Sequence, residues 1–488
     1  MSITGVLVVF IVYFGLLILV SRATSGKQST NDTYFTGNRK SPWIVVAYGM
    51  IGTLLSGVTF MSVPGYVRES QFTYLGMVLG NFVGVFVIAF LLLPLYYRLN
   101  LTSIYSYLRE RFGPKSERSG ALLFIISRLI GSALRMYIVV YILYEFFFKA
   151  SGMPFFVLTA ILIGMILLYT FRGGIGTVVW TDVLQTTAML MALGGTIWIL
   201  KNGLGSSIPE ALQDAGNKGM MTIYDSDWKS STFFWKQFAS GVAGMIAMTG
   251  LDQDMMQKNL SCENLKSSQK NMSLTAVLLL LMNALFLVLG VLLLTYADRN
   301  GIILPEKSDA IFSTIALSNT VSAALFVVGL VAAGFSSADG SLASLTTSFC
   351  INILDFEKNK ELTEEKKLKI RKGIHIMFAC LFFLIIVVFK PFHNDSIIAT
   401  IFKIAGFTYG PLLGMFCFGM TMKKRRVYDR AVPFIAVISP VVSFFIDKYS
   451  KVLLSGYQFG FEIMLLNAAL TFIGLLIFSK TEEAPYQE

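Results

Sequence analysis

The stretch Pro42–Gly65, which reads PWIVVAYGMIGTLLSGVTFMSVPG, decides the fold. It is apolar enough to cross a bilayer, because a transmembrane helix needs about 20 mainly apolar residues. Small and polar residues nevertheless gather near its middle. A later stretch, Trp235–Asp254, reads WKQFASGVAGMIAMTGLDQD and has the same character. Each stretch is a candidate broken helix, whose freed backbone carbonyls are tolerated at membrane depth only where they line a cavity or bind an ion.

The spacing of these two stretches indicates a repeat. The second comes five apolar spans after the first, so two five-helix units, about 42–200 and 235–420, fit an inverted repeat. Paired broken helices in corresponding positions are typical of secondary transporters. The alternative is that the glycines only help helices to pack closely.

Composition supports a membrane protein. The 488 residues are 55% hydrophobic and 14% charged, whereas a soluble domain has roughly 25% charged residues. This excludes a water-soluble enzyme, a disordered chain and a nucleic-acid-binding module. We expect an all-α polytopic protein of the cell membrane with about 13 spans: 3–21, 42–63, 74–97, 121–148, 154–171, 177–200, 235–256, 271–296, 320–350, 374–389, 396–420, 432–446 and 460–479.

The basic residues predict the orientation. Of 40 Lys and Arg residues, 26 fall in one set of alternate loops and 11 in the other, and Arg128, Arg135 and Lys403 lie inside predicted spans. The positive-inside rule then puts the amino terminus outside and the carboxyl terminus in the cytoplasm. No loop is long enough to form a domain of its own. We therefore predict one transporter unit over 1–488, divided into an extra helix and cytoplasmic loop (1–41), two repeats (42–201 and 233–421) and two extra helices (430–480).

No enzymatic or cofactor chemistry is indicated. The four cysteines, Cys262, Cys350, Cys380 and Cys417, are far apart and show no zinc-site spacing. His375 and His393 stand alone at predicted membrane boundaries. We expect no cofactor, no nucleic acid and no obligatory protein partner, only a lipid bilayer, a solute and a coupling ion.

The ninth span is a candidate cation site. Val331–Cys350 reads VAAGFSSADGSLASLTTSFC. At helical spacing Ser337, Ser341 and Ser344 fall on one face, and Ser336 and Asp339 fall on the adjacent face. Hydroxyl and carbonyl oxygens suit a hard monovalent cation. The serines alone would also fit a packing stripe, but a buried carboxylate by default marks an ion or proton path.

A second carboxylate lies in the sixth span. Asp182 occurs in RGGIGTVVWTDVLQ, early in its helix. If this helix packs against the ninth span, Asp182 and Asp339 would lie close together. Two unpaired carboxylates repel, so we expect a second cation or a proton between them.

Arg135 lies well inside the fourth span, in SRLIGSALRMYIVVYIL, where an arginine seldom faces lipid. One interpretation is bidentate binding of a substrate carboxylate. The alternative is an ion pair with Glu145 or with a helix carboxyl end.

Six motifs together resemble the sodium:solute symporter family. They are DTYFTGNR (Asp32–Arg39), TLLSGVTFMSVPG (Thr53–Gly65), SIYSYLRERFG (Ser103–Gly113), RGGIGTVVWTDVLQ (Arg172–Gln185), LDQDMMQKNLSC (Leu251–Cys262) and AAGFSSADGSLAS (Ala332–Ser344). The resemblance implies the leucine-transporter fold, with one extra helix before the ten-helix core and two after it. It also implies alternating access driven by sodium.

The resemblance carries site residues with it. It implies a sodium site made of the backbone carbonyls of Gly52, Leu55 and Ala333 and the hydroxyls of Ser336 and Ser337. Some members have a second sodium site at the position of Asp182, but here Asp339 and Gly340 stand where hydroxyls are expected.

The substrate site most resembles the sialic-acid branch, in which Ser56, Thr59 and Arg135 would bind the solute. Leu54 and Val78 replace polar residues of that branch, so a neutral sugar, another carboxylate or a vitamin stays open as the solute. We expect a sodium-coupled symporter importing a small organic solute. The alternatives are a proton-coupled symporter of the same fold and a membrane sensor.

Overall fold

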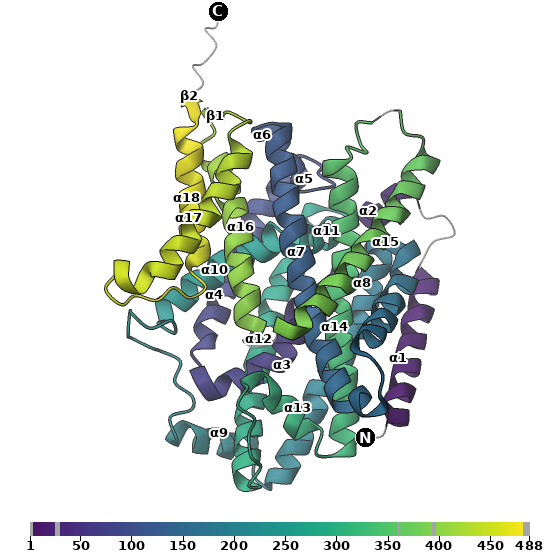
Figure 1. The fold of residues 1–488 in the computed structure, drawn as a ribbon, viewed down its shortest axis with the longest axis vertical. Helices are drawn as coiled ribbons and strands as arrows, with labels where there is room; N and C mark the ends of the chain where they lie inside the picture. The colour runs from purple at the N-terminus through teal and green to yellow at the C-terminus, as the bar shows by residue number, and fades with distance from the viewer. Residues whose placement is uncertain (1–2, 25–29, 360, 393–396, 482–488) are drawn as a thin grey trace, which may run out of the picture.

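The computed structural model describes residues 3–24, 30–359, 361–392 and 397–481, and nearly all of them are helical. Most helices run along the long axis of the molecule (Figure 1). The longer ones are α1 (Ile3–Thr24), α3 (Trp43–Ser70), α4 (Tyr74–Val87), α7 (Pro114–Leu143), α8 (Phe155–Leu204), α10 (Phe234–Met245), α12 (Leu265–Arg299), α14 (Thr320–Ser348), α15 (Glu364–Phe389), α16 (Ile397–Thr421), α17 (Val432–Leu453) and α18 (Ile463–Ile477).

Shorter elements join or extend these helices. The short α-helices are α2 (Asn31–Thr36), α5 (Leu93–Arg98), α6 (Ser106–Arg111), α9 (Ile208–Asn217), α11 (Gln253–Leu260) and α13 (Ile311–Ala316). The π-helical segments are Ile88–Leu92, Tyr144–Phe148, Ile246–Gly250 and Phe349–Ile353, and the 3₁₀ turns are Gly37–Arg39, Lys149–Ser151, Ser308–Ala310 and Lys390–Phe392. Two strands, β1 (Arg425–Val427) and β2 (Ser479–Thr481), pair antiparallel.

The helices suit a membrane-spanning bundle. In the described part of the chain, nine helices are long and apolar enough to cross a membrane, or ten if the two halves of α3 count as one span. Phe155–Phe171 and Ile463–Ile477 are apolar but shorter. Each of the thirteen predicted spans falls on helical structure for most of its length. The count of thirteen crossings and the direction of the chain in the membrane stay predictions.

Helix α3 is broken, as the sequence predicts. Its two halves, Trp43–Gly57 and Thr59–Ser70, are bent by 55° relative to each other. Ser56 lies at the break with φ 42° and ψ 167°, outside the helical region. A positive φ is unfavourable for a residue with a side chain, and such backbone strain is concentrated at functional sites. The first half therefore ends with backbone carbonyls that have no helical partners.

The seventh predicted span is also interrupted, but beyond most of its small residues. Helix α10 continues into the π-helical segment Ile246–Gly250, and a new helix, α11, starts at Gln253. Asp252 caps α11 by accepting hydrogen bonds from the backbone N–H groups of Asp254 and Met255, at 2.9 and 3.2 Å. Gly241 lies in regular helix, where a Cβ atom would stand 2.1 Å from the Met77 carbonyl oxygen. This glycine therefore serves close packing of α10 on α4.

The predicted fifth and sixth spans form one helical run, α8, with a kink at Gly174. Gly174 has φ 56°, and a Cβ atom there would lie 2.5 Å from the Tyr34 Cα atom. Both the positive φ and the close approach of α2 require glycine. The helix therefore changes direction at the glycine pair that the sequence places between the two spans.

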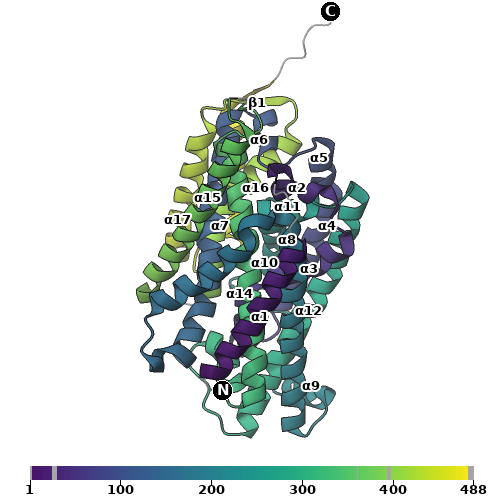
Figure 2. The same ribbon diagram turned by 90° about the vertical axis from the view of Figure 1, so that its right-hand side faces the viewer.

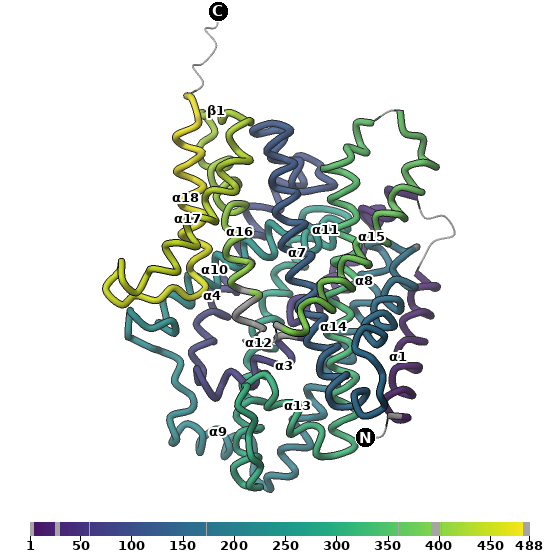
Figure 3. Tube along the Cα trace, in the orientation of Figure 1, coloured from purple at the N-terminus to yellow at the C-terminus, as the bar shows by residue number. Residues whose placement is uncertain are grey.

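Helix α14 lies in the middle of the bundle and packs against α3, α7 and α8. Helix α1 packs on α8 and α14 at one edge, where Figure 2 shows it in front, and α17 and α18 form the opposite edge beside α16. The tube view shows the same arrangement (Figure 3). Helix α1 starts at the end of the bundle near α9, and β2 lies at the opposite end (Figure 1). A first helix that starts at one end of the bundle and a last strand at the other end fit an odd number of membrane crossings.

Candidate functional site

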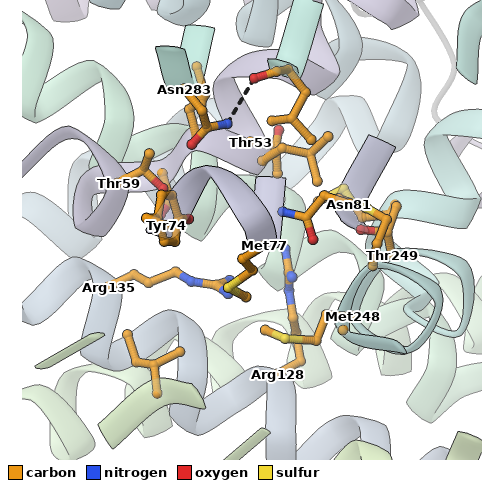
Figure 4. Close-up of a pocket in the computed structure, with 18 residues that line it drawn as sticks. Thr53, Thr59, Tyr74, Met77, Asn81, Arg128, Arg135, Met248, Thr249 and Asn283 are labelled. Atoms are coloured by element: carbon orange, nitrogen blue, oxygen red, sulfur yellow. Dashed lines mark hydrogen bonds between the residues drawn. The ribbon is translucent and has the colours of Figure 1, made fainter. Parts of the chain in front are cut away.

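A cavity of about 120 Å³ lies beside the break of α3. It is lined by residues of α3, α4, α7, α10 and its π-helical continuation, α11, α12 and α16 (Figure 4). Its lining includes all three residues that the sequence assigned to the solute, Ser56, Thr59 and Arg135. The structure therefore brings these three residues, predicted from separate stretches, to one space.

Arg135 lacks the ion pair with Glu145 that one alternative interpretation requires. Its side chain extends into the cavity (Figure 4). Glu145, the suggested partner, instead pairs with Lys149 at 2.7 Å. Across the described ranges, no carboxylate lies within ion-pair distance of the Arg135 guanidinium group. Arg135 is half-buried. Removing a charge from water without a counter-ion costs free energy, so its guanidinium group is suited to an anionic ligand.

Other polar residues of the cavity were missed from the sequence. Asn81 on α4, Thr249 on the π-helical segment and Asn283 on α12 all line it. Asn283 donates a hydrogen bond to the Leu279 carbonyl oxygen at 2.8 Å. Leu54 faces the cavity, as expected, whereas Val78 is buried outside its lining. The lining is therefore more polar than the comparison of Leu54 and Val78 alone suggested.

The residues of the predicted sodium site lie on α3 and α14, two helices that pack against each other. The hydroxyl of Thr53 lies 3.1 Å from that of Ser336. Ser337 is fully buried, and its hydroxyl has no hydrogen-bond partner in the described part of the chain. A buried hydroxyl without a partner is unfavourable unless a ligand satisfies it. Its oxygen can accept a hydrogen bond or coordinate a cation.

The backbone part of this site follows from the break. Gly52 and Leu55 lie just before Ser56, at the break of α3. The end of a helix leaves backbone carbonyl groups without helical N–H partners, which makes the carbonyls of this turn candidate ligands. Gly52 lies close against α8: its N–H donates to the Thr186 hydroxyl at 3.1 Å. Ala333 lies one turn before Ser337 in the continuous helix α14, where its carbonyl oxygen keeps a second lone pair. These groups are neutral oxygens, as a sodium ion prefers.

Asp182 is part of a closed ring of buried side chains. Ser336 donates to its Oδ1 atom at 2.9 Å, and the Lys258 ammonium group lies 2.7 Å from its Oδ2 atom. Lys258 also donates to the Thr53 hydroxyl at 2.7 Å, and Thr53 in turn lies against Ser336. The four residues come from α8, α14, α11 and α3. The ring therefore ties together the four helices around the predicted sodium site.

Asp339 lies near Asp182, as packing of the two helices requires, but has its own partners. Tyr169 and Gln185 donate to its Oδ2 atom at 2.9 and 3.0 Å. Thr181, the residue before Asp182, lies 3.5 Å from the same oxygen. Both carboxylates are fully buried. Helices α8 and α14 do pack together, which is the condition under which the sequence expected the two carboxylates to be close. The sequence did not identify the lysine beside Asp182.

Arg128 holds a second buried charge cluster. Its guanidinium group is 3.4 Å from Asp252 and forms a short contact with Asp254, and its Nε atom donates to Ser341 at 2.8 Å. Tyr409 on α16 also donates to Asp252. The sequence predicts Arg128 inside a span but not these partners. Two aspartates directly after the glycine-rich segment of the seventh span were the available signal, because buried carboxylates need partners.

The comparisons with known proteins agree over nearly the whole chain. The profile described as "Sodium:solute symporter family" matches residues 34–428. The sodium/sialic acid symporter NanT of Aliivibrio fischeri is 26% identical over 443 residues, covering 88% of this chain and 85% of that protein. The human sodium/iodide cotransporter is 27% identical over 431 residues, covering 83% and 65%.

A solved structure gives the fold. A Na⁺-coupled sialic acid symporter in a substrate-bound outward-open state has a TM-score of 0.83 to this chain, with 22% identity, and covers 98% of this chain and 99% of its own. The predicted leucine-transporter fold is thus confirmed. Because the family profile spans most of the 488 residues, the chain belongs to the sodium:solute symporter family: it is a multi-pass membrane transporter that couples a small solute to sodium, and not an enzyme.

Proposed function

We propose that the solute is a small organic anion, such as a sialic acid or another carboxylate, and that its carboxylate binds Arg135. The observation that carries this proposal is the contrast between two neighbouring arginines. Arg128 is paired with Asp252 and Asp254, whereas Arg135 faces the cavity without a counter-ion in the described residues. The named relatives fit, because sialic acid and iodide are both anions.

The remaining lining suits the rest of such a solute. The hydroxyls of Ser56 and Thr59 and the amides of Asn81 and Asn283 can hydrogen-bond to hydroxyl or amide groups. Met77, Met245 and Met248 supply apolar surface that adapts to shape. A few placed polar groups in a mainly apolar wall are typical of small-molecule sites.

We further propose that sodium binds between the carbonyls of Gly52, Leu55 and Ala333 and the hydroxyls of Ser336 and Ser337. The buried, unpartnered hydroxyl of Ser337 supports this assignment. Ser336 can donate its hydrogen to Asp182 and still present an oxygen lone pair to a cation. Leu55 precedes Ser56, which lines the solute cavity. Sodium bound there would order the broken turn and with it the adjacent solute site.

Coupling follows from this adjacency. Sodium enters from outside, joins α3 to α14 and favours the arrangement that binds the solute. After the helices rearrange inward, the low cytoplasmic sodium concentration empties the site. Each net positive charge moved inward gains about 2.3 kcal/mol per 100 mV of membrane potential.

A thermal-shift screen of the purified protein tests the solute class. Sugars, sugar acids, amino acids and carboxylates are added in sodium chloride or in choline chloride. The proposal predicts stabilisation by one or more acids, only with sodium, and none by the matching alcohol or amide. Stabilisation by a neutral sugar that is equal in an Arg135→Gln variant would contradict it.

A further inference from the structure

Lys258 is buried inside the helix bundle, which its place in the sequence does not indicate. It follows directly after the seventh predicted span, 235–256, where the sequence predicts a loop, yet only 1% of its side chain is exposed. It lies on α11, the half-helix after the interruption at Leu251 and Asp252. The interruption lets α11 run inside the bundle, where it contacts α3, α8 and α14.

The Lys258 ammonium group has two close acceptors and one more distant carboxylate. Its Nζ atom lies 2.7 Å from Asp182 Oδ2 and 2.7 Å from the Thr53 hydroxyl, so two of its three N–H groups are within hydrogen-bond distance of an acceptor. Asp254 Oδ1 lies 3.7 Å away, within ion-pair distance but beyond a hydrogen bond. Its charge lies between two carboxylates, one on α8 and one on its own helix. A buried ion pair persists when further hydrogen bonds satisfy its remaining atoms.

Asp182 is also one of the two carboxylates between which the sequence predicts a second cation or a proton. Of its two oxygens, Oδ2 contacts Lys258 and Oδ1 accepts from Ser336. By the family resemblance, hydroxyls would complete a second sodium site, and this chain has Asp339 and Gly340 at those positions. Asp339 is engaged by Tyr169 and Gln185. The positive charge that a cation would bring to Asp182 is therefore already supplied by a side chain.

We propose that Lys258 is a tethered cation that takes the place of a second sodium ion at Asp182. The symporter then binds one sodium ion per protein, at the site of Ser336 and Ser337. This inference rests on the proposed sodium site and makes Lys258 a specificity-determining residue for ion stoichiometry. The ring of Lys258, Thr53, Ser336 and Asp182 holds the ammonium group against the carboxylate.

Equilibrium binding of ²²Na⁺ to the purified protein tests the number of ions without any solute. We expect about one ion per wild-type protein. Lys258→Met removes the charge at similar length, leaves Asp182 uncompensated and should raise the number to about two. Lys258→Arg keeps the charge and should leave it at one, as should the double variant Asp182→Asn/Lys258→Met, which removes both charges.

The outcomes separate the two proposals. Two ions bound to the wild type, or one ion bound to a well-folded Lys258→Met variant, would overturn the tethered cation and leave the sodium site standing. No saturable sodium binding by the wild type would reject the sodium site itself. If Lys258→Met does not fold, the wild type and the double variant decide: one ion on each supports the inference, and two on the wild type with one on the double variant overturns it.

Discussion

The hydroxyl of Thr53 lies 3.1 Å from the hydroxyl of Ser336, so a hydrogen bond joins the broken helix α3 to helix α14. Thr53 stands just before the break at Ser56, and Ser336 stands beside the unpartnered hydroxyl of Ser337. Both belong to the ring that Lys258 and Asp182 complete. Any shift of α3 against α14 therefore disturbs the proposed ion site and the solute cavity together.

Gly52→Ala should weaken the proposed sodium site by disturbing the contact between α3 and α8. A Cβ atom at Gly52 would stand 2.4 Å from the Thr186 hydroxyl oxygen, which accepts the Gly52 N–H. The clash pushes α3 away from α8, at a cost of about 1–3 kcal/mol. We expect a lower melting temperature and weaker sodium binding, measured by sodium titration of the thermal stability.

A second substitution should rescue this variant. Removing the Thr186 hydroxyl leaves 3.4 Å as the nearest approach of the new Cβ atom. Gly52→Ala/Thr186→Ala should therefore recover most of the stability lost by Gly52→Ala. Gly194→Ala is the matched control. Gly194 lies on α8, the helix of Thr186, and nothing lies within 4 Å of its Cβ position. Equal damage from both alanines would contradict the steric explanation.

Arg135→Gln should abolish binding of an acidic solute but leave sodium binding intact. A hydrogen bond to a charged group contributes about 1.5–3 kcal/mol, so losing two predicts a loss in affinity of roughly 10²- to 10⁴-fold. Arg135→Lys keeps the charge but not the bidentate geometry and should bind in between. The measurement is solute-induced thermal shift at saturating sodium. Unchanged solute affinity in Arg135→Gln would refute the assignment.

Arg128→Met should lower the stability of the protein and should not change which solute it binds. The change leaves Asp252 buried without its cation and leaves Asp254 with only Lys258, 3.7 Å from its Oδ1 atom. Breaking a buried ion pair in this way costs about 3–5 kcal/mol. We expect poor yield and a lowered melting temperature in detergent, with Arg128→Lys less affected. A fully stable Arg128→Met variant would mean that these aspartates are not ionised.

The sequence predicts the spans and the broken helix α3 well, for a physical reason. Apolar length identifies helices in a bilayer, and small or polar residues such as Gly52, Ser56 and Thr59 within such a run mark an interruption. Arg135 and Asp182 were also accessible, because a charge inside an apolar run has few explanations other than function or pairing.

Tertiary proximity explains what the sequence did not predict. Lys258 follows an apolar span and is indistinguishable by pattern from a loop lysine until the interruption before α11 is known to turn it inward. In the sequence Gly241 looks like a residue at a helix break. The structure shows that it allows close packing instead, because a Cβ atom there would collide with the Met77 carbonyl oxygen on α4. Asn81 and Asn283 reach the cavity from two helices whose register the sequence leaves open.

The most direct test of sodium coupling at this site compares two serines on α14. Ser337 and Ser344 are both fully buried, but Ser344 donates to the Ser341 carbonyl oxygen at 3.1 Å, whereas Ser337 has no partner in the described chain. The measurement is ²²Na⁺ affinity of purified wild type, Ser337→Ala and Ser344→Ala. We predict about tenfold or greater weakening in Ser337→Ala, equivalent to about 1.4 kcal/mol, and wild-type affinity in Ser344→Ala. Unchanged sodium affinity in a folded Ser337→Ala variant would contradict the site.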